Sequence, residues 1–240
     1  MAAKIILNGL RSIEECLRVN PDRIAKLYFE RAKLSPRLEA IKKQAEKAGV
    51  RVEITVKNEG DEGCSALLSD YQYTDFDDFC AQLKSEIDAG ERPCVLMLDG
   101  VTDPQNLGAI LRTAAFMNVA GVVLPKDRAS PITDTVYRVA SGGLEYVPVC
   151  QVPNLVSAMA RLKECGFWSV GFSEHAKQTL AAVRRDIAPL LVIGNEEKGI
   201  RPLVRENCDF LAKFEGRGKL ASLNASVAAA LAMQWAVSEV

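Results

Sequence analysis

Two glycine-bearing loops, each placed directly after an apolar strand, constrain the fold of this chain more than any other feature. The first loop covers residues 194–202 and follows a predicted strand at 189–193. The second covers residues 216–221 and follows a predicted strand at 210–214. Uninterrupted apolar strands are typical of buried parallel sheets, and open α/β sheets bind ligands beyond the carboxyl ends of their strands. The sequence therefore predicts a ligand site built from both loops.

Neither loop fits the nucleotide-binding motif that it resembles most. Gly194 and Gly199 have P-loop spacing, but Ile200 and Arg201 stand where that motif needs Lys and Ser/Thr. The pair Gly216-x-Gly218 imitates a dinucleotide fingerprint, which needs an acidic residue about twenty positions further on, at the end of another strand. No further strand is expected before the chain ends, so a nucleotide-dependent oxidoreductase is disfavoured.

Charge is distributed unevenly along the 240 residues, although the net charge is only −1. Residues 1–57 contain 13 Lys/Arg and 7 Asp/Glu, a balance of +6, and residues 58–91 contain 1 and 10, a balance of −9. The remaining residues, 92–240, contain 16 and 14, a balance of +2. A basic amino-terminal part could bind a polyanion such as RNA, although surface lysines are also common in other soluble domains.

Cysteine usage and hydropathy predict a cytoplasmic protein. The seven cysteines are scattered and lack CxxC spacing, which favours reduced thiols over disulfides or a zinc site. No apolar stretch reaches the length of about 18 residues that a membrane span needs, and the apolar start is too short for a signal peptide. The single histidine, His175, excludes mechanisms that need two and is expected to be exposed and uninvolved. We predict neither a metal site nor membrane association.

Residues 1–70 are predicted to form a small, basic α/β domain. A strand is expected at 24–29, an amphipathic helix at 36–48 and a half-buried strand at 50–56, where apolar and polar residues alternate. Ser12 comes just before a periodic apolar segment and is predicted to be the N-cap of a helix.

Residues 93–240 are predicted to form a second, larger domain, and residues 71–92 an acidic, solvated linker with a hinge. In the larger domain strands alternate with helices, which predicts a mostly parallel sheet flanked by helices. Strands are expected at 94–98, 121–124, 146–149, 167–171, 189–193 and 210–214, and helices at 107–117, 134–140, 154–165 and from 222 onward. Asn106 is predicted to be the N-cap of the first of these helices.

Three segments of the larger domain together resemble one enzyme family. They are Asn106-Leu-Gly-Ala-Ile-Leu-Arg112, Ile193-Gly-Asn-Glu196-Glu-Lys-Gly199 and Ser222-Leu-Asn224-Ala-Ser226. In this order and spacing they resemble the SpoU/TrmH family of RNA ribose 2′-O-methyltransferases, which belongs to the SPOUT class. The segments at 99–106 and 125–128 are most similar to the branch that methylates a guanosine of 23S ribosomal RNA, and the basic domain is similar in size to the RNA-binding domain of that branch.

The resemblance implies S-adenosylmethionine as methyl donor, a homodimer formed through the catalytic domain, and a C-terminal trefoil knot that holds the cofactor. Chains rarely thread loops in this way, and periodicity alone could not have indicated a knot. Carried onto the matching positions, cofactor contacts are expected from Gly194, Phe214 and Leu223. The catalytic residues expected from the resemblance are Asn106, Arg112, Glu196, Ser222 and Asn224.

Chemistry makes these residue types reasonable. A ribose hydroxyl is a weak nucleophile, and alignment with the donor lowers the barrier more than acid catalysis does. Arg112 is expected to hold a phosphate or the developing alkoxide rather than to act as a base, since an arginine pKa lies above about 12. Glu196 could orient Arg112 or a loop amide, whereas Glu197 is expected to be solvated. Asn224 could cap the last helix, bond the nucleotide, or both.

Two departures from the family pattern leave two alternatives open. In the amino-terminal domain, Arg11 and Glu62-Gly63-Cys64 stand where the family usually has histidines. Where the family usually has Ile-Pro-Met, this chain has Phe214-Glu215-Gly216. Two alternatives to ribosomal RNA methylation therefore stay open. The protein could be a transfer RNA 2′-O-methyltransferase, or a catalytically weak RNA-binding protein of the same fold. The long, apolar closing helix at 223–237 is expected to meet a twin subunit through some of Val227, Leu231, Met233 and Trp235.

Overall fold

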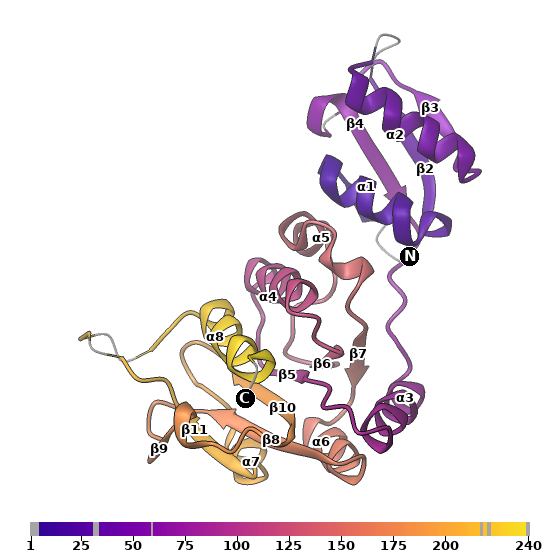
Figure 1. The fold of residues 1–240 in the computed structure, drawn as a ribbon. Coiled ribbons are helices and arrows are strands. Elements are labelled where there is room, and N and C mark those ends of the chain that lie inside the picture. Colours follow the sequence, from indigo (N-terminus) through magenta and orange to yellow (C-terminus); the bar gives the residue numbers. More distant parts are fainter. Residues whose placement is uncertain (1–4, 31–33, 59, 217, 220–221, 239–240) are drawn as a thin grey trace.

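A computed structural model of the chain describes residues 5–30, 34–58, 60–216, 218–219 and 222–238. A small domain lies at one end of the molecule and a larger α/β body at the other, and an extended segment runs down from β4 to α3 (Figure 1). No helix within the described residues is both long and apolar enough to cross a bilayer.

The small domain is a four-stranded sheet with two helices. Its strands are β1 (Ile5–Leu7), β2 (Ile24–Phe29), β3 (Val52–Ile54) and β4 (Cys64–Leu68), in the order β1-β4-β2-β3, and its helices are α1 (Leu10–Val19) and α2 (Pro36–Lys47). The predicted strand at 24–29 and the predicted helix at 36–48 are confirmed. The Ser12 prediction is wrong, because Gly9 is the N-cap and Ser12 lies inside α1.

The body contains a seven-stranded sheet in which every recorded strand pair is parallel. Its strands are β5 (Val95–Asp99), β6 (Gly121–Pro125), β7 (Val149–Val152), β8 (Phe167–Phe172), β9 (Gln178–Thr179), β10 (Ala188–Gly194) and β11 (Phe210–Lys213), in the order β7-β6-β5-β10-β8-β11-β9. The predicted parallel sheet is therefore confirmed. The strand expected at 146–149 begins only at Val149, because a 3-10 turn, η3 (Gly143–Glu145), comes just before it.

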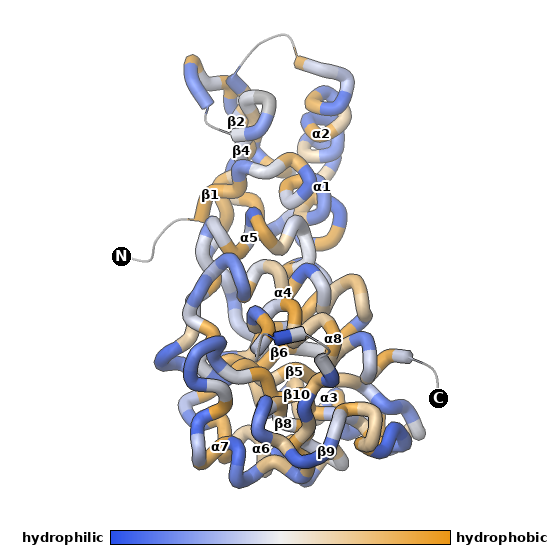
Figure 2. The backbone as a smooth tube through the Cα atoms, turned by 90° about the vertical axis from the view of Figure 1, so that its left-hand side faces the viewer, coloured by the Kyte–Doolittle hydropathy of each residue, from blue (hydrophilic) through white to orange (hydrophobic). Residues whose placement is uncertain are grey.

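Helices cover both faces of this sheet (Figure 1). One face carries α4 (Pro104–Phe116), α5 (Asp134–Ala140) and α8 (Ala225–Val237), and the other carries α3 (Phe76–Asp88), α6 (Leu155–Glu164) and α7 (Pro202–Glu206). Alternate residues of one strand serve the two layers: Leu96 and Leu98 of β5 face the first, while Val95 and Met97 face the second. The orange segments inside the body in Figure 2 mark this sheet as the hydrophobic centre.

The stretch expected to be a solvated linker is partly buried. Its helix α3 places Phe79, Cys80 and Leu83 in the core beside β5–β7, and Thr74 bridges to Cys150 at the edge of the sheet. Apolar residues at helical spacing hide within this acidic run, so its net charge is a poor guide to its packing.

Helix α4 starts three residues earlier than expected. Asp103 is its N-cap, accepting a hydrogen bond from the backbone N–H of Gln105, and Pro104 occupies the first turn, where proline is favoured. The sequence-based prediction that Asn106 is the N-cap is therefore wrong. This residue lies inside the helix, 9% exposed, which leaves its side-chain amide available for contacts with other segments.

Burial distinguishes two faces of α8, and it also determines the protonation of the cysteine thiols. Val227 and Leu231 are each 46% exposed, so the outer face on which some of the four named apolar residues were expected contains these two, whereas Met233 and Trp235 are buried. Six of the seven cysteines are buried. Burial raises the pKa of Cys94 to about 12, so its thiol stays protonated at neutral pH.

Candidate active site

The carboxyl ends of β5 and β10 lie side by side, with Asp99 in register with Gly194. The carboxylate of Asp99 is buried and accepts two hydrogen bonds from Arg201, one from Nε at 2.5 Å and one from the backbone N–H at 2.8 Å. This pair holds the far end of the 194–202 loop against β5. Sequence reasoning did not select either residue, although Asp99 ends a buried strand at the edge where ligands bind.

Asn195 shapes the beginning of the same loop. Its Oδ1 accepts hydrogen bonds from the backbone N–H groups of Glu197 and Lys198 at 3.0 and 3.2 Å, and its Nδ2 donates to the carbonyl of Gly100 at 3.0 Å. Its backbone also exchanges two hydrogen bonds with Gly199, of 3.1 and 2.8 Å. The loop is therefore folded tightly back on itself and fixed to the end of β5.

Gly194 lies where this loop returns, and only glycine fits there. A Cβ added at this position would lie 2.2 Å from the carbonyl carbon of Gly199 and 2.3 Å from the nitrogen of Ile200. Both neighbours are backbone atoms, which cannot move aside as a flexible side chain can. The close turn predicted for Gly194 is thus present at the carboxyl edge of the sheet.

Three of the predicted catalytic residues meet at the amino-terminal end of α8. Glu196 Oε1 accepts hydrogen bonds from Asn106 Nδ2 at 2.7 Å, from Asn224 Nδ2 at 2.5 Å and from the backbone N–H of Ala225 at 3.2 Å. Asn224 Nδ2 also donates to Asn106 Oδ1 at 3.0 Å. We call Asn106, Glu196 and Asn224 the polar cluster. The positive end of the helix dipole favours a carboxylate at this place.

Asn224 has a second task as the N-cap of α8. Its Oδ1 accepts hydrogen bonds from the backbone N–H and the hydroxyl of Ser226, at 2.9 and 2.6 Å. Capping and membership of the polar cluster are therefore combined in one side chain, since its amide nitrogen and its oxygen serve different partners.

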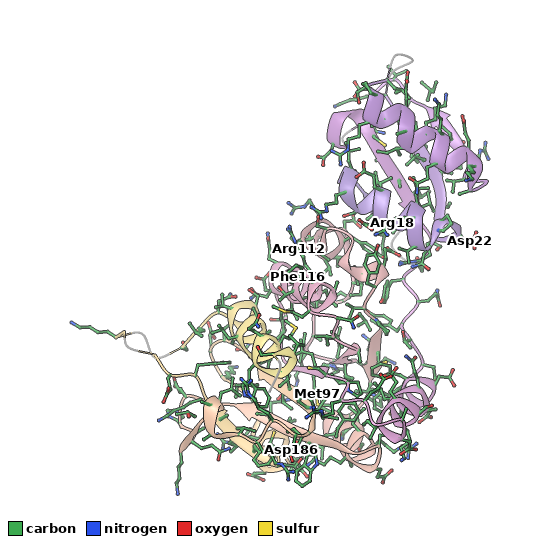
Figure 3. All side chains as sticks on the ribbon, in the orientation of Figure 1. Arg18, Asp22, Met97, Arg112, Phe116 and Asp186 are labelled. Atoms are coloured by element: carbon green, nitrogen blue, oxygen red, sulfur yellow. The ribbon has the colours of Figure 1, made fainter. Side chains whose placement is uncertain are left out.

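Arg112 lies apart from this cluster. It follows Asn106 by six helical residues, which corresponds to about 9 Å along the axis and a different side of α4. Its side chain is exposed, and it has no hydrogen bond or ion pair to any residue that the structure describes. Figure 3 shows Arg112 and Phe116 on α4, in the part of the body nearest the small domain.

The remaining predicted site residues flank the second loop in the sequence. Phe214 stacks on Phe172 of β8, with ring centroids 4.9 Å apart and an interplanar angle of 4°. Leu223 is 43% exposed, and Ser222 is exposed with no hydrogen bond to a described residue. The imidazole of His175 is largely exposed, as predicted, and its Nε2 lies 3.4 Å from Glu174 Oε1.

A cavity of about 660 Å³ lies at the opposite end of the sheet, where β5, β6 and β10 begin. Its lining includes Cys94, Ala120, Pro189 and Trp235 and none of the predicted site residues. The polar cluster and the 194–202 loop, rather than this cavity, therefore define the candidate active site; residues 217, 220 and 221 of the second predicted loop lie outside the described residues.

Both parts of the chain match known families. Residues 93–234 match the SpoU rRNA Methylase family, and residues 6–62 match the family of RNA 2′-O ribose methyltransferase substrate binding domains. A Bacillus subtilis chain assigned to the TrmH family of tRNA/rRNA methyltransferases, YacO, is 34% identical over 232 residues, which cover 94% of this chain and 92% of that one. A Staphylococcus aureus chain with the same assignment is 35% identical over 235 residues, which cover 95% and 93%.

Solved structures share the fold over nearly the whole chain. The SpoU methyltransferase AviRb from Streptomyces viridochromogenes, crystallised with AdoMet, superposes with a TM-score of 0.80 at 22% identity and covers 98% of this chain and 89% of its own. An AdoMet-bound rRNA methyltransferase from Sinorhizobium meliloti gives 0.79 at 19% identity, covering 97% and 86%.

A parallel sheet with a tight glycine loop and a polar cluster at its carboxyl edge defines an α/β protein with a ligand site at that edge. The family and sequence matches are more specific: the chain belongs to the SpoU/TrmH family of RNA methyltransferases. The methyl donor of this family is S-adenosylmethionine. The resemblance found in the sequence is confirmed at the level of the family.

Proposed function

We propose that this protein transfers a methyl group from S-adenosylmethionine to a ribose 2′-hydroxyl of structured RNA, most specifically a guanosine of 23S ribosomal RNA. The observation that carries the proposal is the polar cluster: three side chains from distant parts of the chain converge at the carboxyl edge of the sheet, beside the tight Gly194 loop. The pattern of the segments at 99–106 and 125–128 favours ribosomal over transfer RNA.

The residues at this edge fit S-adenosylmethionine. The turn at Gly194 brings bare backbone to the edge, and the Phe172–Phe214 stack and the exposed Leu223 side chain offer apolar surface. We assign Gly194, Phe214 and Leu223 to cofactor binding. When bound, S-adenosylmethionine supplies an electrophilic methyl group on a positively charged sulfur. The trefoil knot implied by the resemblance is part of this proposal.

Hydrogen-bond accounting indicates which groups of the cluster are left for the substrate. Asn224 uses both amide hydrogens, on Glu196 and Asn106, and its oxygen is taken by Ser226. Asn106 has one amide hydrogen left, and Glu196 has its Oε2, which bonds no described residue. We infer that Asn106 and Glu196 orient the ribose hydroxyl, while Asn224 holds both in place.

We propose that Arg112 contacts the substrate near the transferred methyl group and does not itself remove the hydroxyl proton. Its guanidinium donors are not engaged by any described residue, so they are available to a substrate phosphate, or to the developing alkoxide of a ribose bound across the subunit boundary proposed below. Stabilisation of that charge makes loss of the hydroxyl proton easier. Ser222, which is exposed beside Leu223, is kept as a further candidate contact to the nucleotide.

RNA binding is assigned to the small domain, with boundaries at residues 1–70, 71–92 and 93–240. Its balance of +6 over residues 1–57 supports this assignment, because phosphate contacts dominate the affinity of proteins for nucleic acids. Lys43, Lys47 and Lys57 are exposed and form no ion pair with described residues, so they can contact phosphates.

A transfer assay tests the function and separates the alternatives. Purified protein is incubated with tritium-labelled S-adenosylmethionine and either ribosomal or transfer RNA from cells without the gene, and the labelled nucleoside is identified after digestion. We expect label in a 2′-O-methylguanosine of large-subunit RNA. Label only in transfer RNA would support the tRNA alternative, and cofactor binding without transfer to either RNA would support a binding-only protein.

We also propose that the protein is a homodimer through α4 and α8. Phe116 is 85% exposed at the end of α4, and Val227 and Leu231 form an exposed apolar pair one turn apart on the neighbouring α8. Apolar surface of this kind is typical of subunit interfaces. A dimer formed here would hold Arg112, which shares the exposed side of α4 with Phe116, at the boundary between the subunits.

Replacing Leu231 by aspartate should disrupt the dimer, because an unpaired carboxylate in an apolar interface carries a large desolvation cost. Light scattering at micromolar concentration should give twice the chain mass of 26.2 kDa for the wild-type protein and a value near 26.2 kDa for Leu231→Asp. The matched control is Leu203→Asp, since Leu203 is 61% exposed on α7, on the other face of the sheet. A wild-type mass equal to that of one chain would refute the dimer.

A further inference from the structure

The small domain is docked onto the body through a buried ionic contact. The carboxylate of Glu145, in η3 of the body, is only 1% exposed. It accepts a hydrogen bond from Asn20 Nδ2 at 2.9 Å and two from Arg23 Nη1, both 3.3 Å long. A buried carboxylate needs such partners, because an unpaired charge in the interior is costly.

Arg23 is itself enclosed by aromatic rings from two other elements. Its guanidinium lies 5.1 Å from the ring centroid of Tyr71, in the segment that leaves the small domain, and 5.5 Å from that of Tyr137 in α5. It also donates a hydrogen bond to the Tyr137 hydroxyl. Burial raises the pKa of both tyrosines, so neither phenol adds a negative charge at neutral pH. One arginine thus ties together the small domain, its connecting segment and the body.

Contacts from α1 extend this docking along η3. The Tyr146 hydroxyl donates to Glu15 at 2.5 Å, and Arg18 bonds both residues. The Ser12 hydroxyl donates to the carbonyl of Tyr137 at 3.2 Å. Apolar residues of the small domain and of the body belong to one continuous buried cluster. Together these contacts hold the small domain against the body.

The turn that receives the small domain also touches α4 at Arg112. We call residues 141–146 the docking turn. A Cβ added at Gly142 would lie 2.5 Å from the side chain of Glu15, and one added at Gly143 would lie 3.0 Å from the Cα of Arg112. Ser141 and Gly142 have left-handed backbone, with φ of 50° and 93°, so the turn is tight and has little slack.

We propose that the docking turn is a positioning element that holds Arg112 in register with RNA bound to the small domain, so that Glu145 and Gly143 are positioning residues for methyl transfer. The inference rests on the function proposed above. It deepens that function, because a fixed spacing between the RNA-binding surface and Arg112 selects a folded RNA whose target ribose lies at one set distance. Figure 3 shows Arg18 at the base of the small domain and Arg112 on the adjoining part of the body.

The first test is Glu145→Gln, which keeps the size of the side chain and removes its charge. We expect kcat to fall by at least about tenfold, because small misplacements remote from the chemistry have large effects, while the affinity for S-adenosylmethionine stays within about twofold. The matched control is Glu53→Gln, since Glu53 pairs with Lys26 and Arg51 inside the small domain, away from the docking turn. An unchanged kcat in Glu145→Gln would overturn the proposal.

A disulfide across the same joint provides a rescue. The backbone N–H of Ile6 donates to Asp134 Oδ1 at 3.3 Å, so the two positions are neighbours across the joint, and cysteines are placed there with disulfide formation checked by titration of free thiols. In Ile6→Cys/Asp134→Cys, oxidised and reduced protein should turn over equally within about twofold, and oxidation should restore activity to a variant that also carries Glu145→Gln. Loss of activity on oxidation would mean that the small domain has to move, which contradicts the proposal.

Hydrogen exchange distinguishes failure of this inference from failure of the proposed function. In Glu145→Gln, amides of α4 near Arg112 should exchange faster than in the wild-type protein, and in Glu53→Gln they should not. This comparison needs no RNA. Wild-type protein without methyl transfer would refute the function alone, whereas unchanged exchange at α4 would refute the coupling even in an active enzyme.

Discussion

Replacement of Gly194 by valine should abolish measurable binding of S-adenosylmethionine. The first atom of the new side chain would lie 2.2 Å from the backbone of Gly199, so the loop would have to open. Opening would break the two hydrogen bonds between Asn195 and Gly199 and withdraw the backbone from the cofactor. Calorimetric titration should show a loss of affinity of more than about a hundredfold, which corresponds to about 2.8 kcal/mol.

Two companion variants make this result interpretable. Gly9→Val is the control, because Gly9 has ordinary extended backbone and an added Cβ would meet nothing closer than 3.8 Å. Gly194→Ala carries the same clash with a smaller side chain and should be less disruptive to the remaining fold. If Gly194→Val bound the cofactor with wild-type affinity, the assignment of this loop to the cofactor would be wrong.

The second large effect is expected from Arg112→Lys. Lysine retains the positive charge. It lacks the planar set of donors with which a guanidinium can bind two oxygen atoms at once, either two phosphate oxygens or an alkoxide and an adjacent oxygen. Removal of one well-placed donor to a developing negative charge costs about 10²–10³ in turnover, and we expect a loss of that size in kcat. The fold should be unaffected, because the Arg112 side chain is exposed and bonds no described residue.

Steady-state kinetics and thermal unfolding check this expectation together. The matched control is Arg205→Lys, an arginine of α7 on the far face of the sheet, which should leave kcat unchanged. Turnover within a few-fold of wild type in Arg112→Lys would show that a point charge is sufficient. A parallel loss of activity and thermal stability would instead indicate that Arg112 acts through the fold.

Much of the fold could be predicted because strand and helix signals in the body are local. The apolar run at 189–193 and the helix at 134–140 needed no tertiary information to be recognised. Errors arose where two local signals competed: Asp103 and Asn106 are both good N-cap residues, and Pro104 decides in favour of Asp103. Two signals also competed in residues 71–92: their acidic charge suggested a solvated segment, whereas apolar residues at helical spacing form the buried side of α3.

The candidate site could be predicted only through the combination of three segments. Asn106 and Glu196 are 90 residues apart, and Asn224 lies 118 residues beyond Asn106, so no local pattern indicates that they meet. The ion pair of Asp99 with Arg201, 102 residues apart, was missed because neither residue is unusual in its own segment. The docking turn could not be predicted either, because the partners of Glu145 are Asn20 and Arg23, which are far from it in the sequence.

Mapping of ribose methylation in total RNA, from cells with and without the gene, tests the central claim most directly. Each 2′-O-methyl group blocks alkaline cleavage at its own nucleotide, so a lost modification appears as a new cleavage position. We predict that one guanosine of 23S ribosomal RNA loses its 2′-O-methyl group when the gene is absent and regains it with the wild-type gene but not with an Arg112→Lys copy. Identical methylation maps with and without the gene would contradict the account.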